Sequence, residues 1–180
     1  MSNSSSSAYP TDLQHRWDRL AEVRLETAQP APMQAVRPFP SHLRFGSGGN
    51  GADYCLFGWH NPEADFTWNS GIEAVLELPA PPTAGPYLLN LFAAPFIAGD
   101  MHRQTMELSI RGELIARWSL SYPGHYFALL FDHHLAGTLD LVFRIPDTCS
   151  PKELGLNGDE RRLGVRFHQL WLTPWEGVSL

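Results

Sequence analysis

The chain has 180 residues, of which 43% are hydrophobic and 18% charged, with a formal net charge of −6 at neutral pH. This length suits one domain with a short appendage, and a domain of that size folds without a metal or disulfide scaffold. A nucleic-acid-binding surface needs a basic patch, and the negative net charge of the chain disfavours one. No apolar run approaches the roughly 20 residues that span a bilayer. We therefore expect neither nucleic-acid binding nor membrane insertion.

Two short regions precede the main domain. Residues 1–10 are rich in serine and predict a disordered tail. Within residues 11–42, the stretch TDLQHRWDRLAEVRLE predicts a short helix, because Leu13, Trp17 and Leu20 recur at helical spacing. The proline-rich remainder predicts an extended linker. The chain start has no basic segment followed by an apolar run, so we expect no secretory signal and predict a cytoplasmic, bacterial protein.

Residues 43–180 contain short runs in which apolar and polar residues alternate. The runs at 106–110 and 114–120 flank the turn Arg-Gly-Glu and predict a hairpin. The run at 72–78 alternates in the same way, and four apolar side chains from residue 139 to 145 share one face. The more continuous apolar stretch from residue 87 to 97 predicts a central strand that is buried on both faces.

Seven or eight such strands follow one another with almost no helical pattern. The helices that connect parallel strands are missing. The sequence therefore predicts an all-β domain, an antiparallel β-sandwich of jelly-roll type, preceded by the short N-terminal helix.

One candidate binding segment is GWHNPEADFTWNSG. Carbohydrate sites combine an aromatic ring, which packs on the apolar face of a sugar, with amide and carboxylate groups for its hydroxyls. Trp59, Glu63, Trp68 and Asn69 fit that description and are the first predicted ligand-binding residues. The alternative is that Trp68 lies in the core and that Glu63 and Asp65 belong to a loop.

A second polar segment, SPKELGLNGDERRLG, lies between two predicted strands. Its proline and glycines predict turns, and Asp159 follows an Asn-Gly turn just before Arg161 and Arg162. An ion pair between Asp159 and one arginine could hold the loop in a purely structural role. The same residues could contact a ligand, so Asp159 and Arg161 are the secondary predicted binding residues.

The motifs of these two segments resemble those of β-sandwich modules that accompany bacterial glycosyltransferases and polysaccharide-assembly proteins. The shared pattern is P-D-x-x-S-P-x-x-L-G-x-x-x-D-x-R-x-L-G followed by an apolar strand, with Gly-Trp, Glu and Trp-x-x-Gly upstream. Together these features cover residues 57–172. The resemblance implies a carbohydrate-binding-like sandwich that works near glycan synthesis or modification.

Specific catalytic and metal motifs are lacking. The chain has eight histidines, but their spacing matches no metal-ligand rule. His133 and His134 are adjacent, so a strand would point them to opposite faces. No nucleophile elbow, phosphate-binding loop or dinucleotide motif occurs. We therefore predict no metal and no cofactor, and a small carbohydrate-active hydrolase using Glu63 and Asp65 stays as an alternative.

The main functional prediction is a non-catalytic, glycan-associated binding module in bacterial polysaccharide or glycoconjugate assembly. Another hypothesis is a protein-interaction or scaffold subunit. In that case the apolar stripe of Trp17 and Leu20 and one sheet face would dock on a partner. The partner could be a second copy of the chain, since two-fold homodimers are common.

Overall fold

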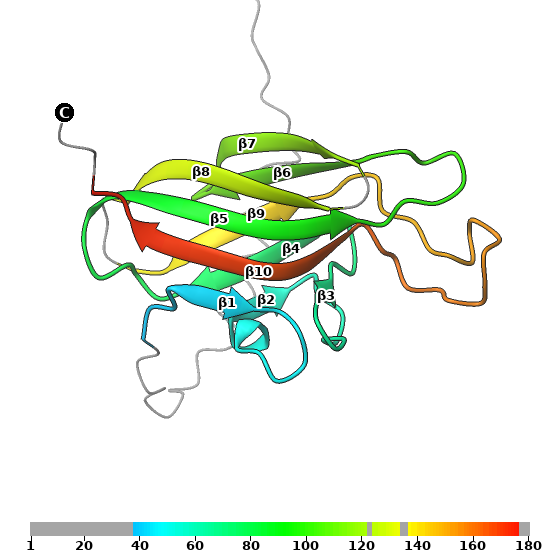
Figure 1. The fold of residues 1–180 in the computed structure, drawn as a ribbon, viewed down its shortest axis with the longest axis horizontal. Helices are drawn as coiled ribbons and strands as arrows, with labels where there is room; N and C mark the ends of the chain where they lie inside the picture. The colour runs from blue at the N-terminus through cyan, green and yellow to red at the C-terminus, as the bar shows by residue number, and fades with distance from the viewer. Residues whose placement is uncertain (1–37, 122–123, 134–136, 177–180) are drawn as a thin grey trace, which may run out of the picture. The chain divides into compact units, whose positions relative to one another are not determined.

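The computed structural model describes residues 38–121, 124–133 and 137–176. Within these ranges two antiparallel sheets pack face to face, so the predicted all-β sandwich is confirmed (Figure 1). The predicted serine-rich tail and N-terminal helix, and nearly all of the proline-rich linker, lie outside the described residues. No helix in the described ranges is long and apolar enough to cross a membrane.

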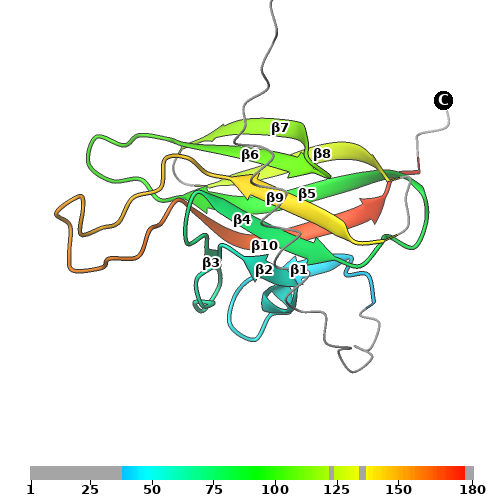
Figure 2. The same ribbon diagram turned by 180° about the vertical axis from the view of Figure 1, so that it is seen from behind.

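Sheet A has the strand order β1-β10-β5-β8, and the two-residue β3 also pairs with β10. Sheet B has the order β2-β4-β9-β6-β7 and is seen from its outer side in Figure 2. The strands are β1 (His42–Arg44), β2 (Cys55–Phe57), β3 (Thr67–Trp68), β4 (Glu73–Leu78), β5 (Gly85–Pro95), β6 (Gln104–Ile110), β7 (Glu113–Leu120), β8 (His125–His133), β9 (Leu139–Arg144) and β10 (Val165–Pro174).

Consecutive strands alternate between the sheets, with one exception, the hairpin of β6 and β7. This hairpin is the one that the sequence predicted. Its turn residues Arg111 and Gly112 both have positive φ angles, 54° and 81°, which is the conformation of a type I′ turn. The other connections cross from one sheet to the other, as expected in a sandwich with non-local strand order.

The hydrophobic core lies between the two sheets. In β9 the alternation predicted from the sequence is confirmed, because Leu139, Leu141 and Phe143 are fully buried. The aromatic residues Phe45 and Phe167 fill the same space from sheet A and the segment after β1. Each such side chain contributes about 1.5–3 kcal/mol of transfer free energy when it leaves water.

Strand β5 lies between β10 and β8, so its central position in a sheet is confirmed, but burial on both faces is wrong. Leu89 and Leu91 are fully buried, whereas Leu88 and Asn90 are half-buried. The reason is that the described chain covers the outer face of sheet A only at one end, where Ala94 is buried. An antiparallel sheet can leave the rest of one face to solvent.

Two apolar residues expected inside the sandwich lie outside it. Leu114 is 51% exposed, because the register between β6 and β7 shifts after Leu108 and pairs Leu114 with Ser109 on the outer face. A bulge of this kind reverses the alternation that sequence reasoning assumes. Ile72, 50% exposed, precedes the first residue of β4 and so lies in the preceding loop.

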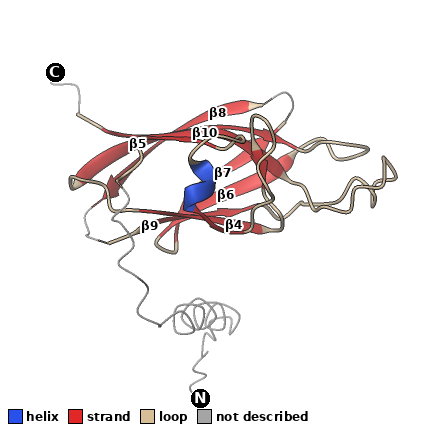
Figure 3. Cartoon of the chain, turned by 90° about the horizontal axis from the view of Figure 1, so that it is seen from below, coloured by secondary structure: helices blue, strands red, loops and turns tan. Residues whose placement is uncertain are grey.

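Loops gather at one end of the sandwich. The β5–β6 and β9–β10 connections extend together on one side of Figure 1, and the segment between β2 and β4 contributes β3 and the loop before it. The 3-10 helix η1 (Gly51–Tyr54) lies between the sheets at the flank formed by β1 and β2 (Figure 3). The candidate site is formed by the loops at this end.

Candidate functional site

The loop from residue 60 to 67 is closed at its base by backbone bonds. Trp59 and Asn69 form an isolated antiparallel bridge, and the backbone N–H of His60 donates to the carbonyl of Trp68 at 2.9 Å. Gly58 begins the turn with a φ of +82°, and a Cβ at this position would lie 2.0 Å from the carbonyl oxygen of Glu73. Glycine is therefore required here, and it lets the following tryptophan turn inward.

Trp59 is anchored in the core. Its ring stacks on Phe45 with centroids 5.5 Å apart and meets Phe143 and Phe167 edge-on. Its indole N–H donates to the carbonyl of Val75 at 2.8 Å. The residue is only partly buried, because one side of it lines a surface pocket described below.

Trp68 and Asn69 lie below the surface. Trp68 is 8% exposed and Asn69 is fully buried. The Asn69 amide donates to the carbonyl of Gly71 at 2.5 Å, while its oxygen accepts the backbone N–H of Val165 at 2.6 Å. Both residues therefore have the environment of core residues, which the sequence left open for Trp68. The Asn69 side chain joins the start of β10 to the loop before β4.

The β9–β10 loop is also closed at its base, where Cys149 and Leu163 exchange two backbone hydrogen bonds. At its start the Ser150 hydroxyl accepts the backbone N–H of Glu153 at 3.1 Å, and the Glu153 carboxylate accepts that of Ser150 at 2.9 Å. This reciprocal arrangement is a capping box. Gly155, with a φ of +68°, ends the predicted short turn.

The two arginines of this loop have different roles. Arg162 donates to the carbonyl of Thr148 and pairs with Glu153 at 3.4 Å, so it ties the loop to its own base. Arg161 instead pairs with the Asp159 carboxylate at 2.8 Å and with Glu63 at 3.0 Å. It therefore connects two loops that are far apart in sequence.

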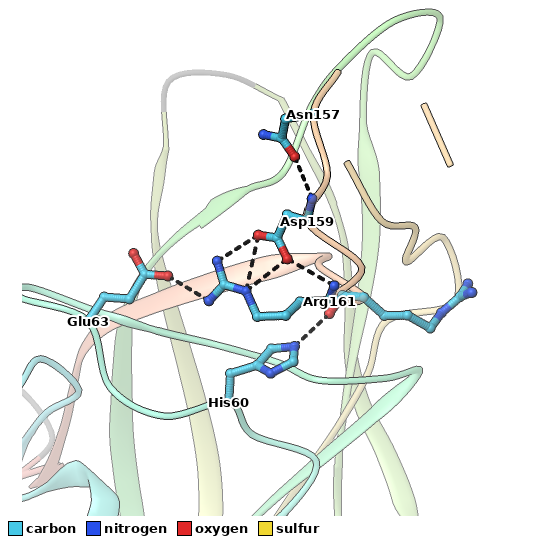
Figure 4. A network of polar contacts seen from close by, with 6 residues as sticks. His60, Glu63, Asn157, Asp159 and Arg161 are labelled. Carbon is cyan, nitrogen blue, oxygen red and sulfur yellow. Dashed lines mark hydrogen bonds and ion pairs between the residues drawn. The ribbon is translucent and has the colours of Figure 1, made fainter. Parts of the chain in front are cut away.

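These contacts form a cluster of four residues, His60, Glu63, Asp159 and Arg161, which we call the rim cluster (Figure 4). His60 joins it because its Nε2–H donates to the carbonyl of Arg162 at 3.0 Å. The backbone N–H of Asp159 donates to the side-chain oxygen of Asn157 at 2.8 Å, which fixes the turn. Predicted binding residues from both sequence segments thus lie side by side.

The electrostatics of the rim cluster favour its charged state. Hydrogen bonds from Arg161 lower the pKa of Asp159 below its ordinary value of 3.8, and the Asp159 and Glu63 carboxylates raise the pKa of Arg161. The side chains of Arg161 and Glu63 are 44% and 37% exposed. They are therefore positioned by each other and still accessible from solvent.

A pocket of about 240 Å³ opens beside the rim cluster. Phe57 and Trp59 supply aromatic walls, and His60, Asn61 and Thr67 supply polar ones. Phe57 is 42% exposed, and His60 belongs to both the pocket and the rim cluster. We call this hollow the rim pocket.

The rim pocket includes residues that sequence reasoning did not select for ligand binding. Phe57 and Asn61 stand next to the predicted residues, but no pattern distinguishes them from loop residues. Among the described residues no group of three or more His, Cys, Asp or Glu side chains could hold a metal ion.

No protein-family model and no curated protein matches the chain. Among solved structures, a family GH115 4-O-methyl-α-glucuronidase with specificity for decorated arabinogalactans is 12% identical, with a TM-score of 0.49. The match covers 83% of this chain and 19% of that one, so this chain spans about a fifth of the enzyme.

Two further similar structures are carbohydrate-binding modules. The C-terminal CBM6 of a marine laminarinase from Zobellia galactanivorans is 12% identical, with a TM-score of 0.44, over 73% of this chain and 97% of that one. The CBM36-1 domain of a xylanase from the hindgut metagenome of Trinervitermes trinervoides is 8% identical, with a TM-score of 0.48, over 76% and 98%. Carbohydrate-binding modules, the class implied by the sequence motifs, are thus among the structural neighbours.

Proposed function

We propose that this domain is a non-catalytic glycan-binding module whose rim pocket and rim cluster hold a sugar. The observation that carries the proposal is that Phe57 and Trp59 form aromatic walls directly beside the Arg161 ion-pair network. An aromatic surface packs on the C–H face of a sugar ring. Carboxylates accept hydrogen bonds from hydroxyls, and a guanidinium donates to them.

The construction of the rim cluster also supports this function. Arg161 is held by Asp159 and Glu63, so little side-chain entropy remains to be lost when a ligand binds. Arg161 uses only one oxygen of the Glu63 carboxylate, Oε1, so the other oxygen can accept a hydrogen bond from a sugar hydroxyl. The pocket is smaller than the roughly 300–1,000 Å³ typical of drug-sized ligands. It therefore suits a terminal sugar of a longer glycan.

For its biological setting we propose bacterial polysaccharide or glycoconjugate assembly in the cytoplasm. This rests on the resemblance of the Trp-x-x-Gly and S-P-x-x-L-G motifs to modules that accompany glycosyltransferases. Neighbouring genes for glycosyltransferases, and recovery of the protein in the soluble fraction of cells, are the observations expected.

A calorimetric titration with neutral oligosaccharides tests the proposed site. Saturable binding is expected, with a loss of about tenfold or more in Phe57→Ala and Arg161→Ala, as for truncated aromatic and arginine anchors. Leu114→Ala is a matched control, since Leu114 is also exposed but lies in β7 of sheet B.

Two results would contradict the proposal. One is the absence of binding across a broad oligosaccharide panel. The other is binding that both rim variants leave unchanged while the Leu114→Ala control weakens it.

A second candidate function, self-association, is favoured by the flank where β7 and β8 lie. Both strands form the free edge of their sheet, and Trp118 and Phe127 contact across the gap at 4.8 Å. These two residues are only partly buried although they pack against the core, and Leu130, on the outer face of β8, is 50% exposed. Free edges and incompletely covered core residues suit pairing with a second copy of the chain.

Sedimentation of the full chain over a range of concentrations tests this alternative. A dimer that Trp118→Ser and Leu130→Glu convert to monomer would support it. A monomer at every concentration would exclude it, and would leave glycan binding as the one remaining proposal.

A further inference from the structure

The outer face of sheet A carries a row of aromatic side chains. Tyr126 of β8 is paired in register with Phe92 of β5, and their rings stack with centroids 4.4 Å apart and an interplanar angle of 15°. The next contact is from Phe92 to His168 of β10 at 4.7 Å, and then from His168 to Phe66 at 5.3 Å. These four residues form the aromatic row.

Strand geometry explains why the row is continuous. In β5 the neighbours Leu91 and Ala93 are buried, so Phe92 points outward. In β10 the register shifts between Phe167 and Gln169. His168 is the extra residue, and it projects from the outer face beside Phe92. The bulge thus brings a polar ring into line with the aromatic ones.

Cationic side chains lie at the end of the row. The Arg166 guanidinium lies over the rings of Phe66 and Trp68, at 5.2 and 5.9 Å from their centroids. Its Nε is buried without a hydrogen-bond partner among the described residues. Arg44 of β1, in register with Gln169, is exposed on the same face. The guanidinium groups of Arg166 and Arg44 therefore place two positive charges on this face.

Carboxylates are scarce on this face. The outward positions of the described strands of sheet A include one, Asp132, at the other end of β8 from Tyr126. Asp65, in the loop before β3, is a second carboxylate near His168. In a chain of net charge −6, a face with two arginines beside an aromatic row is complementary to a negatively charged ligand.

The dimensions suit a chain rather than a small molecule. From Tyr126 of β8 to Arg44 of β1 the face crosses three strand spacings, about 14 Å at roughly 4.8 Å each. A sugar ring can pack on the exposed ring of Tyr126, while uronate carboxylates can meet arginine forks in a bidentate geometry. A nucleic acid would need a broader basic surface than this chain offers.

We propose that the outer face of sheet A, from Tyr126 to Arg166 and Arg44, is a second glycan surface that binds acidic polysaccharides. This inference rests on the proposed function, because it assigns a ligand class to a glycan-binding domain. Its strand residues are distinct from those of the rim cluster, and the two surfaces meet at Phe66, whose carbonyl accepts the backbone N–H of Glu63 at 2.8 Å. The two sites let the domain hold an acidic chain on the sheet and a sugar end at the rim.

Calorimetric titration of the full chain with oligogalacturonate, and with xylo-oligosaccharides as a neutral counterpart, tests the proposal. Oligogalacturonate should bind, more weakly as salt is raised. Tyr126→Ala and Arg44→Gln should each weaken it by about tenfold, the usual size for an aromatic or arginine anchor. Both residues are exposed, so neither variant is expected to unfold the domain. Arg166→Gln should act in the same direction, and Arg117→Gln on sheet B is the matched control.

Each outcome separates this inference from the proposed function. Loss of oligogalacturonate binding in Arg161→Ala but not in Tyr126→Ala or Arg44→Gln would overturn the inference and leave rim binding intact. Xylo-oligosaccharide binding without any oligogalacturonate binding would do the same. No binding of either ligand would overturn this inference, whereas the proposed function is overturned only by the absence of binding across the broad oligosaccharide panel. A dimer in solution that Tyr126→Ala converts to monomer would reassign the face to a protein partner.

Discussion

The rim cluster and the outer face of sheet A are built in different ways. The rim cluster depends on two loops, and Arg161 joins Asp159, two residues away, to Glu63, ninety-eight residues away. The aromatic row depends on adjacent strands whose register is fixed by the backbone ladder. At the rim, charges neutralise one another. On the sheet, Arg166 faces rings instead of carboxylates. A polar cluster such as the rim cluster can be structural and still accessible to solvent. An arginine without a carboxylate partner on a rigid sheet face is a stronger indication of a ligand site.

Trp59→Ala should give the largest loss of stability, because it removes the contacts with Phe45, Phe143 and Phe167 and the bond to Val75. Truncating a buried aromatic residue costs about 3–5 kcal/mol. Tyr126 is 74% exposed, so Tyr126→Ala should change the free energy of unfolding by less than about 1 kcal/mol. Urea denaturation measures both variants. Equal losses would show that the aromatic row is part of the core.

Asn69→Ala should come next, with a loss of about 1–3 kcal/mol, because it leaves the buried N–H of Val165 and the carbonyl of Gly71 without their partner. Thermal unfolding is the measurement. A tolerated substitution here would mean that the base of the rim is not held by this side chain, and would weaken the contrast between the loops and the sheet.

Asp159→Asn should have a smaller and pH-dependent effect. The folded-state pKa of Asp159 is lowered by Arg161, so the ion pair stabilises the protein above the ordinary value of 3.8. This contribution is lost as the pH falls through the folded-state pKa. Denaturation curves from roughly pH 6 to roughly pH 3 should show a shallower decline in the variant. Identical pH profiles in the two proteins would count against the ion pair.

His168→Gln should have the smallest effect and concerns the sheet face. Burial, with Arg166 nearby, lowers the pKa of His168 below its ordinary value of 6.5. The unfolded chain therefore takes up the proton first. Stability attributed to neutral His168 is present above pH 6.5 and declines as the pH falls towards the folded-state pKa. The variant should remove this part of the acid dependence, which denaturation curves at several pH values measure. An NMR titration of the His168 imidazole in the unsubstituted protein measures the folded-state pKa directly.

Much of the fold could be predicted from local pattern. The alternation from Leu139 to Ile145 and the Arg111-Gly112 hairpin depend on neighbouring residues, and both predictions are confirmed. Leu114 was misplaced because a bulge in the β6–β7 pairing reverses the alternation. No residue in the sequence marks that bulge.

The candidate site was predictable only in part. The composition of the Trp59–Asn69 segment indicates aromatic and polar groups but not their burial, which the bridge between Trp59 and Asn69 decides. The proximity of Asp159 to Arg161 follows from short spacing, whereas the contact of Glu63 with Arg161 depends on how distant loops meet. The aromatic row draws on four segments and on the bulge at His168, so no single stretch of sequence could reveal it.

An NMR titration of the full chain with a neutral oligosaccharide tests the central claim most directly. Glycan binding at the rim predicts saturable shifts of backbone amides in the segments 57–67 and 150–163, including Asn61 and Arg161, and their loss in Phe57→Ala. Spectra that stay unchanged at saturating sugar, or shifts confined to the β7–β8 flank, would contradict it.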